Sequence, residues 1–181
     1  GSALQTACSN GRRDIVELLL ERGANINAKG SSALQTACSN GCRDIIELLL
    51  ERGANINAKC GEYGSVLQIA CSNGRRDIVQ LLLERGASIN AKGGYFGNAL
   101  QAACFNSSKD VVELLLERGA DINAKCGEYG SALQTACSNG CRDIIQLLLE
   151  RGADVNAKSG YYGNALQAAS FFGRTEIVAL L

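Results

Sequence analysis

One segment of this chain occurs twice with almost no change. Residues 32–59 and residues 131–158 are identical except at three positions, and the rest of the chain consists of variants of the same unit. Each unit has an equivalent leucine, and the interval between these leucines is constant except for a shorter first one. The leucines are Leu4, Leu34, Leu67, Leu100, Leu133 and Leu166. A chain with such a period stacks each unit on its neighbours, so no single central core is expected.

The first part of each unit has the pattern of a short, well-capped helix. In the fifth unit, Ser131 and Gln134 form a Ser-x-x-Gln capping box, in which the two residues satisfy each other's backbone N–H groups. Gly140 follows as a terminator, because glycine readily adopts the left-handed conformation at a helix end. The pattern therefore predicts a helix over residues 132–139.

A second helix is predicted over residues 142–151. Asp143 lies in its first turn and Arg151 in its last turn, where each charge complements the helix dipole. Its apolar face is too wide for a surface helix, so we expect neighbouring elements to cover it on two sides. The face consists of Ile144, Ile145, Leu147, Leu148 and Leu149. Residues 153–163 then predict an extended, hairpin-like connection. Both helices are shorter than the roughly 12–15 residues that an isolated helix needs, so stacking must stabilise them.

Two units depart from the common pattern. The connection at residues 27–32 is three residues shorter than the others, which predicts a truncated hairpin with the helix stack preserved. Ser107 replaces the helix-terminating glycine of the fourth unit. We therefore expect Ser107 to adopt a positive φ at a cost that glycine would avoid.

Several stretches resemble the ankyrin repeat family. The sequences IVQLLLERGA at residues 78–87 and GADVNA at residues 152–157 fit that family closely, as does the period of about 33 residues. The family-typical Thr-Pro-Leu-His is replaced here by Ser-Ala-Leu-Gln at residues 131–134. This variant, together with GYYGNALQAAS at residues 160–170, resembles the ankyrin arrays of filamentous fungi. Such arrays are often the C-terminal sensing half of large intracellular receptor-like proteins.

The resemblance implies a fold and a division into repeats. The fold would be an all-α ankyrin repeat solenoid, a single domain over residues 1–181 in which helix-turn-helix repeats are joined by hairpin loops. We expect about six repeats, the first and last of them incomplete, as if cut from a longer array. Their boundaries are 1–29, 30–59, 60–92, 93–125, 126–158 and 159–181.

Composition argues against several functions and locations. Lysine plus arginine equals aspartate plus glutamate at 18 each, so no electrostatic attraction to nucleic acid or to an anionic membrane is expected. No apolar run approaches the roughly 18 residues of a membrane span, and the N-terminal residues lack the pattern of a signal peptide. The nine cysteines follow the repeat rather than a disulfide framework. A cytoplasmic or otherwise intracellular, reducing location and no structural disulfide are therefore expected.

Catalysis is also disfavoured. The chain has no histidine, so neither a Cys–His nor a Ser–His–Asp site can form. Asp143 and Glu150 recur in other repeats, as a solvated helix edge would and an acid–base pair would not. No phosphate-binding loop of the P-loop type occurs, and the glycine-rich residues 93–97 lack a strand-to-helix context. We therefore expect no enzymatic activity, no cofactor and no small-molecule substrate.

The cysteines fall into three groups. Five of them share one repeat position and are predicted to be small buried hydrophobic residues. They are Cys8, Cys38, Cys71, Cys104 and Cys137. Cys42 and Cys141 lie four residues after two members of this column, but a zinc site needs four ligands, so metal binding is disfavoured. Cys60 and Cys126 lie at hairpins and are expected to be exposed and oxidisable.

With catalysis and metal binding disfavoured, the remaining functional candidate is a surface that binds a partner. In the ankyrin family, partners bind along the hairpin tips and the ends of the first helices on the concave face. Here most helix ends carry a Ser–Asn pair, which is expected to be solvated and to contribute little, whereas two ends and several hairpins carry aromatic residues, which are hot-spot material. The candidate partner-binding residues are Tyr95, Phe105, Glu128, Tyr161, Phe171 and Phe172, with Lys92, Lys125 and Lys158 beside them.

The aromatic residues also have a packing interpretation. For Phe105, Tyr95 and Tyr161, binding and packing remain open alternatives. Packing beneath the hairpins is favoured for the aromatic residues that precede a turn glycine: Tyr63, Phe96, Tyr129 and Tyr162. If the face is used, Tyr95, Phe105, Tyr161 and Phe171 would form an aromatic strip interrupted by the polar fifth repeat. The lysine row is most simply explained by solubility.

The leading functional hypothesis is a non-catalytic module, expected to be monomeric, that binds an unidentified protein partner on this face. One alternative is a structural spacer within a larger multidomain protein. Another is an engineered or reconstructed ankyrin scaffold, which the near-identical repeats suggest; the free cysteines and the irregular first hairpin argue against design.

Overall fold

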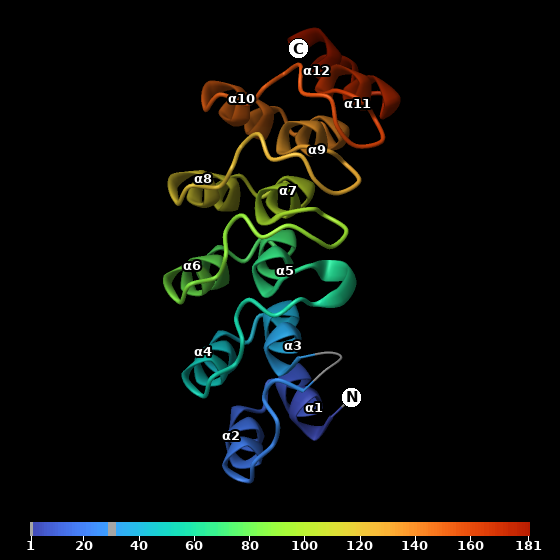
Figure 1. Cartoon of the computed structure of the whole chain (residues 1–181). Coiled ribbons are helices and arrows are strands. Elements are labelled where there is room, and N and C mark those ends of the chain that lie inside the picture. Colours follow the sequence, from blue (N-terminus) through green and yellow to red (C-terminus); the bar gives the residue numbers. More distant parts are fainter. Residues whose placement is uncertain (1, 29–31) are drawn as a thin grey trace.

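The structure is a computed structural model that describes residues 2–28 and 32–181. Within these residues it contains twelve α-helices, a short 3-10 helix and no strand (Figure 1). The helices are α1 (Ala3–Ser9), α2 (Arg13–Glu21), α3 (Ala33–Asn40), α4 (Arg43–Glu51), α5 (Val66–Ser72), α6 (Arg76–Glu84), α7 (Ala99–Phe105), α8 (Lys109–Glu117), α9 (Ala132–Asn139), α10 (Arg142–Glu150), α11 (Ala165–Phe171) and α12 (Thr175–Leu180), and the 3-10 helix η1 (Gly61–Tyr63) precedes α5.

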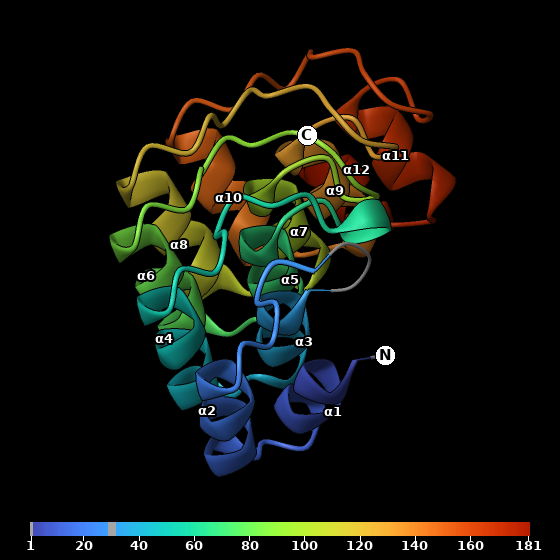
Figure 2. The same ribbon diagram turned by 60° about the horizontal axis from the view of Figure 1, so that its bottom comes forward.

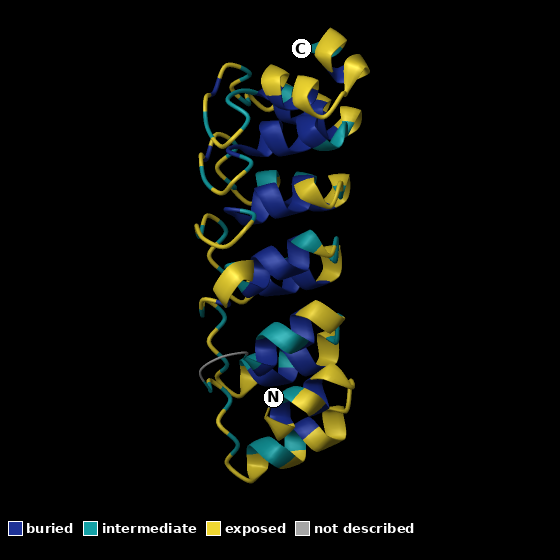
Figure 3. Ribbon diagram, turned by 90° about the vertical axis from the view of Figure 1, so that its right-hand side faces the viewer, coloured by how far each residue is buried: buried dark blue, intermediate teal, exposed yellow. Residues whose placement is uncertain are grey.

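The helices form a two-column stack. Odd-numbered helices lie above one another in one column, and α2, α4, α6, α8 and α10 lie in a second (Figure 1). The connecting loops are stacked along one side of both columns (Figure 2). Buried residues face the interior of each layer and the space between layers, whereas the loops are largely exposed (Figure 3). The architecture is the predicted all-α repeat solenoid.

Capping of the first helices follows the sequence pattern only in part. The Ser131 hydroxyl accepts a hydrogen bond from the Gln134 N–H, as predicted. The Gln134 side chain, however, does not return to the cap. Its Nε2 donates to the carbonyl of Ser159 at 2.8 Å, in the next hairpin loop. Gln68 and Gln101 reach forward in the same way, so these glutamines join successive repeats.

The second helices supply most of the largest fully buried side chains. In α10 the observed bounds are Arg142–Glu150, one residue shorter than predicted, with Arg151 as the C-cap. Ile145 and Leu148 are completely buried, because α9 and the neighbouring layers cover two sides of the helix. The helices of the end repeats are less covered. In α2 only Val16 is buried, and in α12 only Ile177 is.

A row of asparagines links the turns that follow the second helices; we call it the turn ladder. Each amide nitrogen donates to the glycine carbonyl at the end of the next repeat's second helix, at 3.1–3.2 Å. Each amide oxygen accepts a backbone N–H from the following turn, at 2.8–2.9 Å. The members are Asn27, Asn57, Asn90 and Asn123. The ladder explains the regular recurrence of the Asn-Ala dipeptide within this chain, which sequence analysis interpreted only as a family motif.

The structure confirms the positive φ predicted for Ser107. Its φ is 59°, and it is the one non-glycine residue with a positive φ among the described residues. The equivalent Gly140 has a φ of 76°. The Ser107 hydroxyl lies 2.8 Å from the Cys141 sulfur, a contact that partly offsets the strain. The truncated hairpin predicted at residues 27–32 falls largely on residues 29–31, which lie outside the described residues.

Candidate interaction surface

Close backbone packing positions the hairpin loops that carry the candidate residues. A Cβ atom on Gly160 would lie 2.6 Å from the carbonyl oxygen of Glu128, so only glycine allows the loops to approach this closely. The Tyr95 N–H donates to the Glu62 carbonyl at 2.7 Å, and the Tyr161 N–H donates to the Glu128 carbonyl at 3.0 Å. The loops therefore form a continuous edge whose side chains have defined places.

Seven aromatic rings from three hairpin loops and two helix ends form one continuous cluster, which we call the aromatic cluster. Successive ring centroids lie 5.0–6.4 Å apart, in tilted or edge-to-face arrangements. Such geometries are favourable beyond the burial of apolar area. The members are Tyr95, Phe96, Phe105, Tyr129, Tyr162, Phe171 and Phe172.

Tyr129 joins the two halves of the cluster. Its ring centroid lies 5.9 Å from that of Tyr95 and 6.3 Å from that of Tyr162. Its hydroxyl lies 3.0 Å from the Tyr95 hydroxyl. Burial is the main cause that raises the pKa of Tyr129 well above its usual range, and the hydrogen bond to Tyr95 adds to the effect. Tyr129 is therefore neutral at physiological pH.

The arrangement corrects the predicted strip. The fifth repeat does not interrupt it, because Tyr129 from that repeat fills the gap. Sequence analysis favoured simple packing for Phe96, Tyr129 and Tyr162, yet these residues are only half-buried and connect the more exposed rings. A signal was present in the sequence: with Tyr63 they form a column at the repeat spacing, and stacked repeats bring such a column together.

The candidate residues differ in exposure. Tyr95, Phe105 and Phe172 are 37–43% exposed, whereas Phe171 is 72% and Tyr161 is 79% exposed. Tyr161 stands apart from the aromatic cluster and instead lines, with Phe171 and Tyr162, a surface hollow of about 520 Å³. The three lysines Lys92, Lys125 and Lys158 are exposed and line neither this hollow nor the larger one described next.

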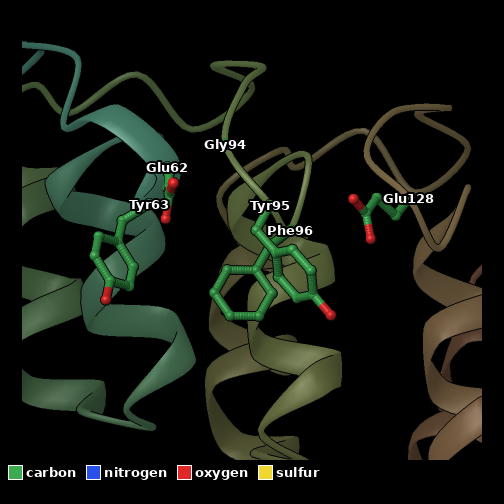
Figure 4. Close-up of a pocket in the computed structure, with 6 residues that line it drawn as sticks. All are labelled: Glu62, Tyr63, Gly94, Tyr95, Phe96 and Glu128. Carbon is green, nitrogen blue, oxygen red and sulfur yellow. The ribbon is translucent and has the colours of Figure 1, made fainter.

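A larger hollow on this surface is a groove of about 590 Å³ between the loops of the third, fourth and fifth repeats. Figure 4 shows the rings of Tyr95 and Phe96 in its centre, with a glutamate on either side. We call it the aromatic groove. It is lined by Glu62, Tyr63, Gly94, Tyr95, Phe96 and Glu128. The structure thus brings Tyr95 and Glu128, both predicted site residues, into one groove.

The helix-end asparagines, which sequence analysis expected to be solvated, also form hydrogen bonds between repeats, although Asn40, Asn73 and Asn106 are exposed. Asn40 Nδ2 donates to the Ser9 carbonyl at 3.1 Å, and Asn139 Nδ2 donates to the Phe105 carbonyl at 2.7 Å. Asn73 Nδ2 donates to the Ser39 carbonyl at 3.4 Å. The Asn106 amide nitrogen, when it is turned toward Ser72, donates to the Ser72 carbonyl at 3.1 Å. This helix-end ladder consists of Asn40, Asn73, Asn106 and Asn139. It joins each first helix to the preceding one, a connection between repeats that sequence analysis did not predict.

The cysteine column behaves as predicted, but the hairpin cysteines do not. Cys8, Cys38, Cys71, Cys104 and Cys137 are completely buried, and burial raises the pKa of Cys8 to about 11 and that of Cys137 to about 12. Cys60, expected to be exposed, is buried because its loop folds back against the stack. Cys126 is half-buried, and its sulfur donates to Gln101 Oε1 at 2.9 Å. Burial raises the pKa of both thiols, which disfavours the reactive thiolate.

Metal-binding and membrane-spanning features are both lacking in the described part of the chain. Among residues 2–28 and 32–181, no three His, Cys, Asp or Glu side chains come together in a way that could hold a metal ion. Within the same ranges, no helix has the length and apolar character needed to cross a bilayer. The features that stand out chemically are therefore the aromatic cluster and its groove.

The fold and the surface together define a tandem-repeat solenoid with an aromatic edge. Family comparison is more specific: ankyrin repeat models match residues 1–60 and 60–126 (ankyrin repeats, three copies) and residues 115–169 (ankyrin repeats, many copies). The chain belongs to the ankyrin repeat family. A search of curated protein sequences found no match to this chain. Ankyrin repeats are generally protein–protein interaction modules and are typically non-catalytic.

Proposed function

We propose that this chain is a non-catalytic module that binds a protein partner on the face formed by the hairpin loops and the ends of the first helices. The observation that carries the proposal is the aromatic cluster. Its rings are ordered by one another, yet Phe171 and Tyr95 keep a large exposed fraction. Pre-ordered, partly exposed aromatic side chains lose little entropy on binding and commonly dominate interface energies.

Phe171 and Tyr161 are the proposed anchors at the C-terminal end of the face. They are the most exposed aromatic residues, and they line the same hollow. Phe105 and Phe172 are proposed to support them, and Glu128 to contribute charge. Lys92, Lys125 and Lys158 lie beside the face and would add favourable contacts only to an acidic partner segment.

The setting of the module is part of the proposal. We propose that residues 1–181 act as one domain of six repeats, monomeric by itself, in a reducing intracellular compartment. Six of the nine cysteines are buried free thiols, which suits such a compartment. The sequence GYYGNALQAAS at residues 160–170 supports a place in an array like those of fungal intracellular receptor-like proteins.

The experiment that tests the function compares captured proteins between matched variants. Wild-type protein, Phe171→Ala and Ser39→Ala would each be used to capture partners from the native cell extract. Ser39 is an exposed helix-end residue at the equivalent position in the second repeat. We expect a partner that binds wild-type and Ser39→Ala equally and binds Phe171→Ala at least tenfold more weakly.

Stability must be measured on the same samples. Phe171→Ala should melt within about 2 °C of wild type, because its side chain is mostly exposed. A partner that binds all three proteins equally would contradict the proposed face. The absence of any specific partner would favour the structural-spacer alternative.

A further inference from the structure

The aromatic groove combines two kinds of lining that favour one kind of ligand. Its floor and one wall are the rings of Tyr63, Tyr95 and Phe96, and its rims carry the carboxylates of Glu62 and Glu128. In Figure 4 the two carboxylates approach Tyr95 and Phe96 from opposite sides. Aromatic faces carry negative electrostatic potential, so both components of the lining attract positive charge.

The carboxylates of the groove are not paired with a basic side chain within the described part of the chain. Among the described residues, neither Glu62 nor Glu128 forms an ion pair, although several other glutamates do. Among residues 2–28 and 32–181, no lysine or arginine lines the groove. The chain as a whole has a formal net charge of zero, so this negative character is local.

The same pairing recurs two repeats later. The backbone carbonyl of Glu62 accepts the N–H of Tyr95, and that of Glu128 accepts the N–H of Tyr161, so each glutamate is held beside a tyrosine on the next loop. Glu128 and Tyr161, with Gly127 and Gly160, line a second hollow of about 310 Å³. Glu128 therefore lies between two aromatic, acidic subsites on one edge.

We infer that this edge binds a basic, extended segment of a protein partner, with one arginine or lysine side chain in the aromatic groove and a second at Glu128 and Tyr161. The inference rests on the proposed function, since it names the chemistry of the partner for that face. A cation in the groove would contact aromatic faces while pairing with carboxylates, which is how desolvated cations are commonly held.

The repeat spacing sets the spacing of the two cations. The Glu62–Tyr95 pair and the Glu128–Tyr161 pair lie two layers apart. Adjacent helix layers are about 8–10 Å apart, so these pairs are separated by roughly 16–20 Å. An extended chain advances about 3.3 Å per residue. Two basic residues that are separated by about five or six positions would therefore match the two subsites.

The test uses a peptide with two arginines six positions apart in a glycine–serine background, and the same peptide with citrulline in place of both arginines. Citrulline keeps the shape of arginine but is neutral. Calorimetric titration at low salt should show at least tenfold tighter binding of the arginine peptide. A lysine version would report whether the subsites prefer the guanidinium group.

Matched variants locate the site. Glu128→Gln removes the carboxylate of the second subsite, which also lines the edge of the aromatic groove, and keeps the backbone carbonyl that orders the loops. It should weaken the arginine peptide at least fivefold and leave the citrulline peptide unchanged. Glu51→Gln, at the end of α4, removes an exposed carboxylate away from the hairpin edge and should change neither.

Three outcomes would overturn the inference: equal affinity for the arginine and citrulline peptides, no binding of either at millimolar concentration, or equal effects of Glu128→Gln and Glu51→Gln. These results leave the proposed function standing if the captured partner still depends on Phe171. Conversely, loss of that dependence with charge-selective peptide binding retained would contradict the proposed anchor and support the cationic subsites.

Discussion

The first helices end in two ways along the array. In the N-terminal repeats the last residues are a Ser–Asn pair, as at Ser39 and Asn40 in α3, whereas α11 ends with Phe171 and is followed by Phe172. The backbone is similar at both places. In α3 the asparagine amide donates to the preceding repeat. After α11, where Phe172 occupies the asparagine position, Arg174 Nε donates to the Ser138 carbonyl at 2.9 Å instead.

This difference shows that the stack needs a bridge at this position but not a particular residue. The acceptor is always a backbone carbonyl of the preceding first helix, and a side chain from either of two places can reach it. The bridge uses the backbone carbonyl at the adjacent serine position; among the described residues, the one serine hydroxyl found to add a contact to it, that of Ser9, accepts from Asn40 Nδ2 at 3.4 Å. The serine side chain can therefore be replaced by phenylalanine, as at Phe105 and Phe171, while the fold is kept.

A second difference lies within the aromatic half. Phe105 and Phe171 occupy equivalent positions two repeats apart, yet Phe105 is 37% exposed and Phe171 is 72% exposed. Tyr129 from the following repeat covers Phe105. No later repeat in this chain covers Phe171 in that way. The same residue type at the same repeat position is therefore packed against neighbouring rings at Phe105 and mostly exposed to solvent at Phe171.

The largest expected effect on stability separates these two phenylalanines. Phe105→Ala removes a ring packed against Tyr95, Phe96 and Tyr129, so it should lower the free energy of unfolding by about 2 kcal/mol. Phe171→Ala should lower it by no more than about 0.5 kcal/mol. Thermal melting of both variants measures the difference, expected to be roughly 4–8 °C for Phe105→Ala. Equal losses of unfolding free energy in the two variants would show that Phe105 contributes no more to stability than Phe171.

The helix-end ladder gives the next largest effect. Asn139→Ala removes the 2.7 Å hydrogen bond to the Phe105 carbonyl, and the expected loss is about 1–2 kcal/mol because that carbonyl is left without its donor. Asn10→Ala is the matched control: Asn10 occupies the same repeat position, but no earlier repeat precedes it in this chain. Chemical denaturation should show a clear shift for Asn139→Ala and little for Asn10→Ala. Comparable shifts would mean that the ladder is not what stabilises the stack.

A substitution at Ser107, in the fourth repeat, should give a smaller change in unfolding free energy, and in the stabilising direction. Ser107→Gly relieves a positive φ and should raise the unfolding free energy by about 1 kcal/mol, reduced somewhat by loss of the contact with Cys141. The reverse substitution, Gly140→Ser at the equivalent position, should lower it by about 1 kcal/mol. Denaturation midpoints of the two variants should move in opposite directions; movement in the same direction would show that φ is not the cause.

The smallest effect concerns only one end of the molecule. In α12 only Ile177 is buried, whereas α10 buries Ile144, Ile145, Leu147 and Leu148. The amides of residues 177–180 should therefore exchange with solvent much faster than those of residues 146–149, without a change in global stability. Hydrogen-exchange mass spectrometry would resolve the two segments. Equal protection would show that α12 is held by more than its buried contacts.

Much of the molecule could be predicted from local patterns. The period, the paired helices, the serine and asparagine caps, the glycine helix ends and the buried cysteine column depend on interactions within about one turn or on apolar spacing. For this reason α9 was predicted with its observed bounds, and Ser107 with its positive φ. The sequence by itself determined the class of fold and the residues from which any binding face must be made.

The tertiary structure alone decided how those residues are used. Gln134 matches a capping box, but the loop of the next repeat places the Ser159 carbonyl within its reach, and that longer-range hydrogen bond is the one formed. Tyr129 precedes a turn glycine, which predicted simple packing beneath its hairpin, but the stacking of the loops places its ring between those of Tyr95 and Tyr162. Both outcomes depend on distances between layers, which are set by how whole repeats pack and are not encoded in the residues of any single repeat.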